Sequence, residues 1–262
     1  MKQTQWIVLG LCTGLFLVLY FGCETKAPEQ KAIEKSRALN IETTTITNLL
    51  RDAKSQLTGN GSSDVLSLEA MLEQSATDTQ RLEVLKKLSG TWFDLGFPAI
   101  AGFYAEEVAN TQASANAWSM AGTTYMICLQ RPQEEKVKAF CLERAVASFE
   151  SAISENPEDP THKLNLALVY TEQPPQDNPM KGILMLRDLN QQDPENPAVL
   201  YHLGRLAIMT GQFEKAVERL SAGLKSKPDS KRIACLLSEA YQGLGDTQNA
   251  TLYQQACEQN AN

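Results

Sequence analysis

The sequence is poor in residues that bind metals. It contains only two histidines, His162 and His202, and none of its six cysteines stands in a CxxC pair. A zinc site needs several such ligands at characteristic short spacings. The sequence therefore predicts no metal site, and nothing in it indicates a bound cofactor.

An excess of basic residues and a glycine-rich phosphate loop are also missing. The 24 Lys and Arg residues are outnumbered by 31 Asp and Glu residues, which gives a formal net charge of −7. Such a surface repels the phosphate backbone of nucleic acids. We therefore expect no nucleic-acid partner and, without a phosphate loop, no small-molecule substrate.

Recognisable catalytic groups are absent as well. The carboxylates are scattered, and neighbours such as Glu106 and Glu107 do not face each other on a helix. Neither His162 nor His202 has a serine, cysteine or acidic partner at a recognisable spacing, so both are predicted to be structural or solvated. The chain is predicted not to be an enzyme.

Charge is absent from one long segment, residues 6–22, "WIVLGLCTGLFLVLYFG". Its length is at the lower edge of what spans the roughly 30 Å hydrocarbon core of a membrane. Three interpretations remain: a retained transmembrane anchor, which the length favours; a lipoprotein signal cut before Cys23, which would then carry the lipid; and a buried helix of the folded domain. Tyr20 and Phe21 are bulkier than residues usual before a lipidated cysteine.

The charges that flank this segment bear on its orientation in a membrane. Lys2 precedes it and several Lys and Arg residues follow it, which taken literally would keep the following chain in the cytoplasm. Acidic residues are interleaved with those cations, and a short tail with one Lys is typical of export signals. The sequence favours a bacterial inner-membrane protein with the following domain in the periplasm.

The rest of the chain repeats itself about every 34 residues, which indicates a repeat architecture. The clearest copy has Leu203, Gly204, Ala207, Gly211, Ala216, Leu220, Gly223 and Pro228. A copy follows from Leu237, and earlier copies lie around Leu85, Trp118 and Leu166. Two copies contain insertions between their halves.

This pattern resembles the tetratricopeptide repeat (TPR), from about Leu82 to the C-terminus. The repeats lie near residues 82–114, 115–159, 160–196, 197–230 and 231–262. The first copy lacks the terminal proline. The resemblance implies an all-α, right-handed α-solenoid of about five helical hairpins with a concave groove.

The residue chemistry supports this fold independently. Apolar residues recur at spacings of three and four, which predicts two helices per repeat. Gly211 ends the first helix and Pro228 stops the second, while Gly204 and Ala216 let the two helices approach closely. A single hairpin cannot bury its apolar face, so stability must come from stacking on its neighbours.

Residues 23–81 are predicted to form a linker and a helical cap. Helices are expected over Thr43–Leu57 and Val65–Glu73, with a flexible turn over Thr58–Ser63. They could form a degenerate hairpin that caps the solenoid, or a loosely packed stalk.

The insertions interrupt two repeats. The first is expected over Leu129–Phe140, with Cys128 and Cys141 at its two ends, which permits a disulfide if the domain is exported. Otherwise both are unpaired small apolar residues. The second, Glu172–Pro179, has three prolines and is either a recognition edge or a tolerated surface loop.

Proteins of this family bind partners mostly through exposed side chains of the first helix of each hairpin. The corresponding positions here are Lys86, Phe93, Asn116, Ser119, Thr123, Met126, Leu164, Leu168, Tyr201, Arg205, Met209, Arg232, Cys235 and Glu239. This set suits a peptide or helix whose apolar residues meet Leu164, Leu168 and Met209, with an acidic group near Arg205 and Arg232. It does not reproduce the Lys and Asn clamp of chaperone-tail binders.

The sequence therefore predicts a membrane-tethered TPR scaffold that binds a protein or peptide partner and assists assembly of an envelope complex. The alternative is a purely architectural subunit of a larger membrane complex, without a ligand in its groove.

Overall fold

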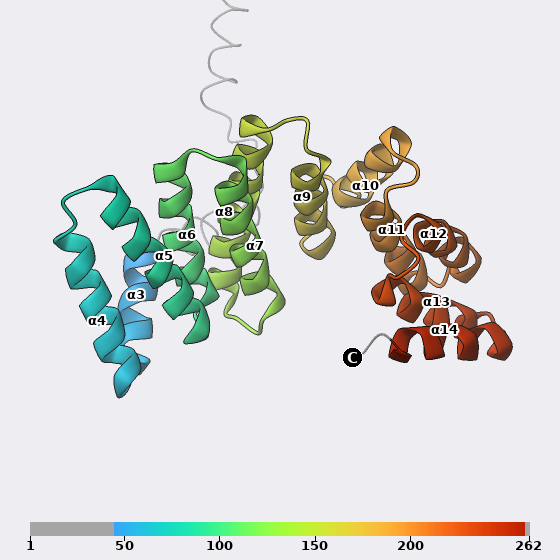
Figure 1. Ribbon diagram of the computed structural model, residues 1–262, viewed down its shortest axis with the longest axis horizontal. Coiled ribbons are helices and arrows are strands. Elements are labelled where there is room, and N and C mark those ends of the chain that lie inside the picture. Colours follow the sequence, from blue (N-terminus) through green and yellow to red (C-terminus); the bar gives the residue numbers. More distant parts are fainter. Residues whose placement is uncertain (1–44, 260–262) are drawn as a thin grey trace, which may run out of the picture. The chain divides into compact units, whose positions relative to one another are not determined.

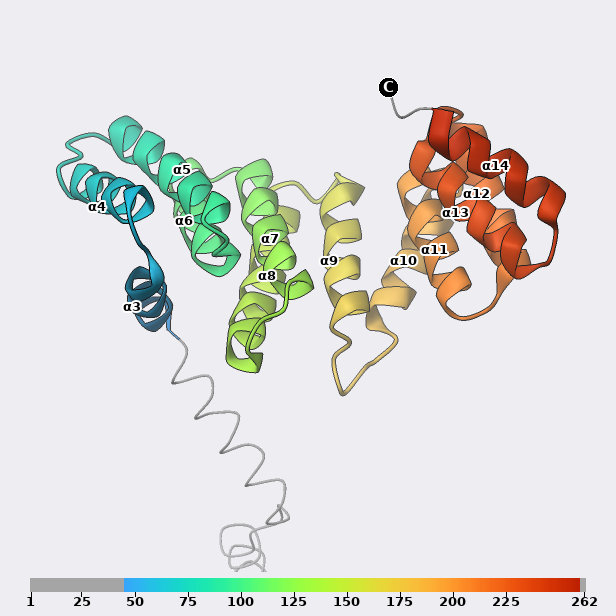
Figure 2. The ribbon, with the colours of Figure 1, turned by 90° about the horizontal axis from the view of Figure 1, so that it is seen from below.

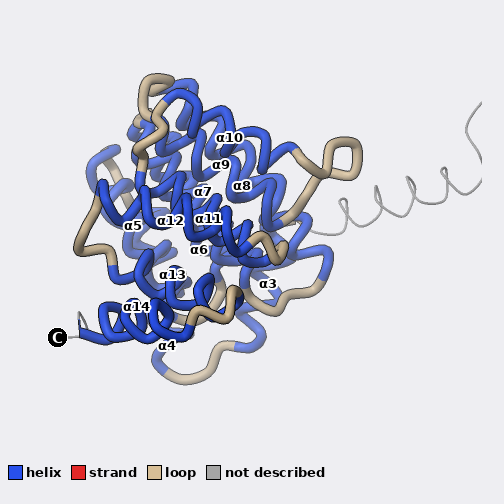
Figure 3. Tube along the Cα trace, turned by 90° about the vertical axis from the view of Figure 1, so that its right-hand side faces the viewer, coloured by secondary structure: helices blue, strands red, loops and turns tan. Residues whose placement is uncertain are grey.

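The computed structural model describes residues 45–259 (Figure 1). Residues 6–22 and Cys23, where the sequence predicts a membrane segment and an alternative lipid site, lie outside this range. Every regular element within it is a helix (Figure 3). The twelve helices are α3 (Ile46–Gln56), α4 (Asn60–Glu73), α5 (Asp78–Asp94), α6 (Pro98–Gln112), α7 (Ala115–Gln130), α8 (Glu135–Glu155), α9 (Pro160–Glu172), α10 (Lys181–Gln192), α11 (Pro197–Met209), α12 (Phe213–Ser226), α13 (Lys231–Gly243) and α14 (Thr247–Gln259).

Ten of these helices form five consecutive hairpins, from α5/α6 to α13/α14. The two helices of each hairpin pack against each other, and each second helix also contacts the first helix of the next hairpin. The hairpins follow one another in chain order (Figure 1, Figure 2). The predicted all-α stack of five hairpins is confirmed for this part of the chain.

The first helices of the hairpins all begin with a side-chain cap. The side chains of Thr77, Ser114, Asp159, Asn196 and Ser230 accept hydrogen bonds from backbone N–H groups in the first turns of α5, α7, α9, α11 and α13. The second helices α6, α8, α10 and α12 lack such caps. A polar cap satisfies N–H groups that a helix start leaves unpaired, so each repeat restarts at a defined residue.

Glycine lets the two helices of a hairpin touch. A Cβ atom on Gly204 of α11 would lie 2.5 Å from Cγ of Leu220 on α12, and one on Gly122 of α7 would lie 2.8 Å from Cε1 of Phe149 on α8. Both contacts are impossible distances for real carbon atoms. The large side chain of the second helix therefore fills the space that the glycine leaves, as predicted from the repeat pattern.

Gly211 ends helix α11, also as predicted. Its φ angle is 69°, in the left-handed region that glycine adopts without the strain of a Cβ atom. Its N–H donates to the carbonyl of Ile208, and the following residue, Gln212, donates to Ala207. These bonds close the last turn of α11 and start the turn to α12.

The core is a series of buried clusters, and one polar network crosses it. The hydroxyl of Tyr125 on α7 donates to Oε2 of Glu106 on α6 at 2.8 Å, and Nη1 of Arg144 on α8 donates to Oε1 of the same carboxylate at 2.8 Å. Burial, followed by the charge of Glu106, raises the pKa of Tyr125 well above its usual value. Tyr125 therefore stays protonated, and the Glu106 carboxylate that accepts from it and from Arg144 links three helices.

The N-terminal helices differ from the sequence expectation. Helix α4 starts at Asn60, so most of the segment predicted as a flexible turn forms its first turn. Helices α3 and α4 also do not pack as a hairpin: α4 lies against α5 and α3 against α6. One ion pair joins them, from Lys54 Nζ to Glu69 Oε2 at 2.6 Å. Gly59, with φ 62°, supplies the sharp break that lets α4 begin early.

Substitution of Gly182 tests the close packing of α9 and α10. A Cβ atom there would lie 2.6 Å from the carbonyl oxygen of Ala167 and 2.7 Å from the amide nitrogen of Thr171, and backbone atoms cannot move aside as a side chain can. We expect Gly182→Ala to lower the free energy of unfolding by about 1–3 kcal/mol, measured by urea unfolding.

Gly90→Ala is the matched control. Gly90 lies in α5, and a Cβ atom there would meet nothing within 4 Å. Because alanine favours the helix by about 0.5–1 kcal/mol over glycine, this variant should be more stable than the wild type. Equal stability of the two variants would contradict the packing account.

Candidate functional site

The predicted partner-binding residues all lie on α5, α7, α9, α11 and α13, whose exposed side chains we call the first-helix face. Six of them are exposed and six are half-buried. The exposed residues are Lys86, Asn116, Thr123, Met209, Arg232 and Glu239. The half-buried residues are Phe93, Ser119, Met126, Tyr201, Arg205 and Cys235.

Leu164 and Leu168 are a correction to the sequence prediction. Each is only 8 % exposed, and both belong to a core cluster with Leu186 of α10 and Val199 of α11, against which Met126 of α7 packs. Neighbouring repeats cover these side chains, so they are not available to a partner. Of the predicted apolar contacts, Met209 remains, with 71 % of its surface exposed.

The part of the first-helix face that lies on α7 is uncharged. Helix α7 contains no acidic or basic residue over its whole length. Asn116, Met120 and Thr123 are exposed on it, and Met120 is 65 % exposed. The amide Nδ2 of Asn165 on α9 donates to Oγ of Ser119 at 3.5 Å. This part of the face offers amide and hydroxyl groups around one apolar side chain.

Basic and aromatic side chains meet at the other end of the face. Arg232 of α13 lies over the ring of Tyr201 of α11, with its Cζ atom 4.5 Å from the ring centroid. Arg205, one turn after Tyr201 on α11, pairs with Glu172 at the end of α9, with Nη2 and Oε1 3.3 Å apart. These two contacts connect the first helices of three consecutive hairpins.

His202 lies beside these basic and aromatic side chains, and they affect its pKa. Its ring packs edge-on to the ring of Tyr201, with centroids 4.9 Å apart. Burial, then Arg205 and Arg232, lower the pKa of His202 to about 4. His202 is therefore neutral at pH 7.

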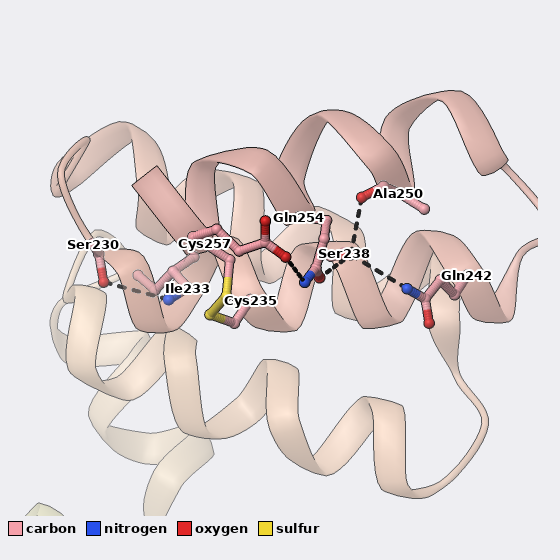
Figure 4. The surroundings of a disulfide bond; sticks show 9 residues. Ser230, Ile233, Cys235, Ser238, Gln242, Ala250, Gln254 and Cys257 are labelled. Carbon is pink, nitrogen blue, oxygen red and sulfur yellow. Dashed lines mark hydrogen bonds between the residues drawn. A yellow bond between two sulfur atoms is a disulfide. The ribbon is translucent and has the colours of Figure 1, made fainter. Parts of the chain in front are cut away.

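Two disulfides each join the two helices of one hairpin. Cys128 of α7 and Cys141 of α8 are bonded and fully buried. Cys235 of α13 is bonded to Cys257 of α14 and both are half-buried (Figure 4). Cys235 is therefore a covalent link rather than a free groove side chain.

Parts of both predicted insertions are helical, so the loops are shorter than the sequence indicates. Helix α7 continues to Gln130 and α8 starts at Glu135, so most of the first insertion is helical. The proline-rich insertion forms the connection from α9 to α10 over residues 173–180. Glu172, expected in this insertion, is instead the last residue of α9.

A separate hollow of about 280 Å³ lies between α3 and the starts of α6 and α8. Its apolar lining includes Leu49, Phe97 and Val137. None of the predicted partner-binding residues contributes to it. Its acidic residues Asp52 and Glu134 are mostly exposed and pair with neighbouring basic side chains.

Over residues 45–259, no group of three or more His, Cys, Asp or Glu side chains could hold a metal ion. Of the helices in this part of the chain, none combines the length and apolar character that crossing a membrane requires.

Comparison with known proteins supports the TPR assignment. Residues 181–247, from α10 to the start of α14, match the family model for the tetratricopeptide repeat. A comparison with curated protein sequences gives no match.

Several solved TPR structures are similar to this chain. TTC0263, a thermophilic TPR protein in Thermus thermophilus, is 21% identical with a TM-score of 0.51, and the match covers 76% of this chain and 100% of that one. A MamA structure from Desulfovibrio magneticus RS-1 is 16% identical, covers 69% and 97%, and has a TM-score of 0.45. YrrB, described as a TPR protein with an unusual peptide-binding site, is 12% identical, covers 74% and 93%, and has a TM-score of 0.41.

These findings support a stack of α-helical hairpins with the fold that TPR proteins have. The likeness to TTC0263 establishes the fold alone. The match to the repeat model supports the family for the stretch that contains Arg205, Met209 and Arg232.

Sequence reasoning missed three residues of the site. Glu172 and Asn165 pair with predicted residues, and His202 lies beside two of them. Each of the three lies on a first helix. Asn165 and His202 directly follow a predicted residue, so the neighbours of the repeat's exposed positions are where the sequence could have indicated them. Cys257 had no signal, because its partner Cys235 is not at a recognisable spacing.

His202 should make the domain sensitive to acid. Its pKa is depressed in the folded state, so between about pH 6.5 and 4 only the unfolded chain takes up this proton, and stability falls as the pH falls through that window. We expect His202→Gln to remove about 1–2 kcal/mol of the stability difference between pH 7 and pH 4.5. Urea unfolding at both pH values measures it, and an unchanged difference would contradict the pKa assignment.

The Cys235–Cys257 bond should hold the terminal helix. Helix α14 has one strongly buried residue, Ala250, and its main neighbour is α13. A bond that closes a loop of this length stabilises by about 3 kcal/mol in the chain-entropy model. Replacing both cysteines with serine should remove hydrogen-exchange protection from α14 but not from α5 to α8. Unchanged protection in α14 would show that its side-chain packing suffices.

Proposed function

We propose that this protein is a membrane-tethered TPR scaffold that binds a protein or peptide partner on its first-helix face. Several observations support partner binding. The first helices carry the exposed Asn116, Thr123 and Met209 and the half-buried Tyr201 and Arg205. Large side chains of the second helices instead fill the space between the two helices of a hairpin. In this role the protein acts by shape and contact.

We infer that the TPR domain works in an oxidising compartment. Both disulfides support this, because disulfides persist in the periplasm and are rare where thiol reductants are abundant. Together with the uncharged segment at residues 6–22, they favour a bacterial envelope protein with its TPR domain in the periplasm. Lipid attachment at Cys23 is the alternative form of anchoring.

The proposed role is assembly of a protein complex in the envelope. A tether confines the first-helix face to the membrane region and so raises its effective concentration for a partner there. A purely architectural subunit would instead bury its helix faces against other subunits and leave no site for a separate partner.

The double variant Arg205→Glu, Met209→Ala tests partner binding. It reverses a charge at the basic end of the face and removes its most exposed apolar side chain. We expect the proteins that co-purify with the full chain from membranes to fall at least about tenfold, since a lost charge-assisted contact costs about 1.4 kcal/mol or more.

Arg187→Glu with Leu184→Ala is the matched control. Both residues are exposed on α10, a second helix. This variant should keep its partners. Partners that survive the Arg205 and Met209 changes would favour the architectural alternative.

A further inference from the structure

Four basic side chains stand on α11, in the turn between α12 and α13, and at the start of α13. They are Arg205, Lys227, Lys231 and Arg232, which together with Tyr201 we call the basic strip. Within residues 45–259, none of the three residues Lys227, Lys231 and Arg232 forms an ion pair. Helix α11 contains no acidic residue. On a chain with a net charge of −7, this is a local reversal of sign.

The start of α13 is an unfavourable place for these charges. Ser230 caps the helix, and Lys231 and Arg232 occupy its first turn, where the N-terminal end of the helix dipole repels cations. Local rules of helix composition are typically broken where function requires it. Arg232 gains a contact with Tyr201, but Lys231 gains no ion pair within the described chain.

Glu172 shows where a carboxylate meets the strip. Its Oε1 lies 3.3 Å from Nη2 of Arg205, and the two side chains are 33% and 36% exposed. Glu172 is the last residue of α9, where the helix dipole disfavours negative charge. Arg205 therefore holds the Glu172 carboxylate in a place that the dipole of α9 disfavours. A carboxylate of a partner can take its place.

We propose that the basic strip binds an acidic segment of the partner protein, whose carboxylates displace Glu172 from Arg205 and meet Arg232 beside Tyr201. This rests on the proposed function, because it specifies the partner of the same face. The geometry that supports it is the exposed Arg232 over Tyr201 and the partly exposed ion pair of Arg205 with Glu172.

A polypeptide fits the strip better than a membrane surface does. Arg205 is about two-thirds buried beside Glu172, and Tyr201 is half-buried beneath Arg232. A narrow chain with carboxylate side chains can reach between such groups. A flat lipid surface would reach the exposed Lys227 and Arg232 more readily than the partly buried pair of Arg205 and Glu172, and nucleic acid is repelled by the net negative charge.

Peptide binding to the full chain in detergent tests the proposal. The probe is a short fluorescein-labelled peptide of alternating glutamate and alanine, followed by fluorescence polarisation, with a lysine and alanine peptide as the opposite-charge control. Arg205→Gln and Arg232→Gln should each weaken binding by about tenfold. Glu172→Gln should tighten it by about threefold, because the internal competitor is lost.

Arg187→Gln is the matched control, since it removes the same charge from an exposed position on α10. An equal loss of peptide affinity in this variant would mean that only the net charge matters, and it would overturn the proposal. So would binding of the lysine peptide, no tightening in Glu172→Gln, or displacement of the acidic peptide by phosphatidylglycerol added to the detergent micelles. If the co-purified partners still depend on Arg205 and Met209, only the acidic-segment proposal falls, and the proposed function stands.

Discussion

The architecture depends on the absence of one side chain in each of several hairpins. Leu220 and Phe149 occupy the space that a Cβ atom would need on Gly204 and Gly122, and Gly182 meets the backbone of the preceding helix. Such contacts fix the distance between the two helices of a hairpin, which in turn sets the surface on which the next hairpin packs. The stack is therefore built from seams that tolerate little change.

The seams use only some positions of the first helices, and this leaves the other positions available for binding. Their glycines and apolar residues face the seams, while the remaining positions differ from repeat to repeat. On α7 these positions are uncharged, whereas on α11 and α13 they include Arg205 and Arg232. One repeated framework thus presents a face whose chemistry changes along its length, and under the proposed function this change would determine which partner binds.

The sequence predicted the hairpins well because their signals are local and recur five times. Its errors concern residues whose surroundings come from other repeats. Leu164 and Leu168 occupy positions that are exposed in the repeat pattern, yet side chains of α7, α10 and α11 cover them here. The early start of α4 and the Cys235–Cys257 bond were missed because a weak turn sequence and a long cysteine spacing do not specify them. The pairing of Arg205 with Glu172 joins residues 33 positions apart in two consecutive repeats, so no local signal in the sequence specifies it.

The central claim is that the first helices, and not the second, contact the partner. Site-specific photocrosslinking in intact membranes tests it most directly, with the crosslinking residue placed at exposed Thr123 on α7 or at exposed Glu150 on α8. The account predicts a crosslinked partner from position 123 and none from position 150. Crosslinks from position 150 alone would contradict it.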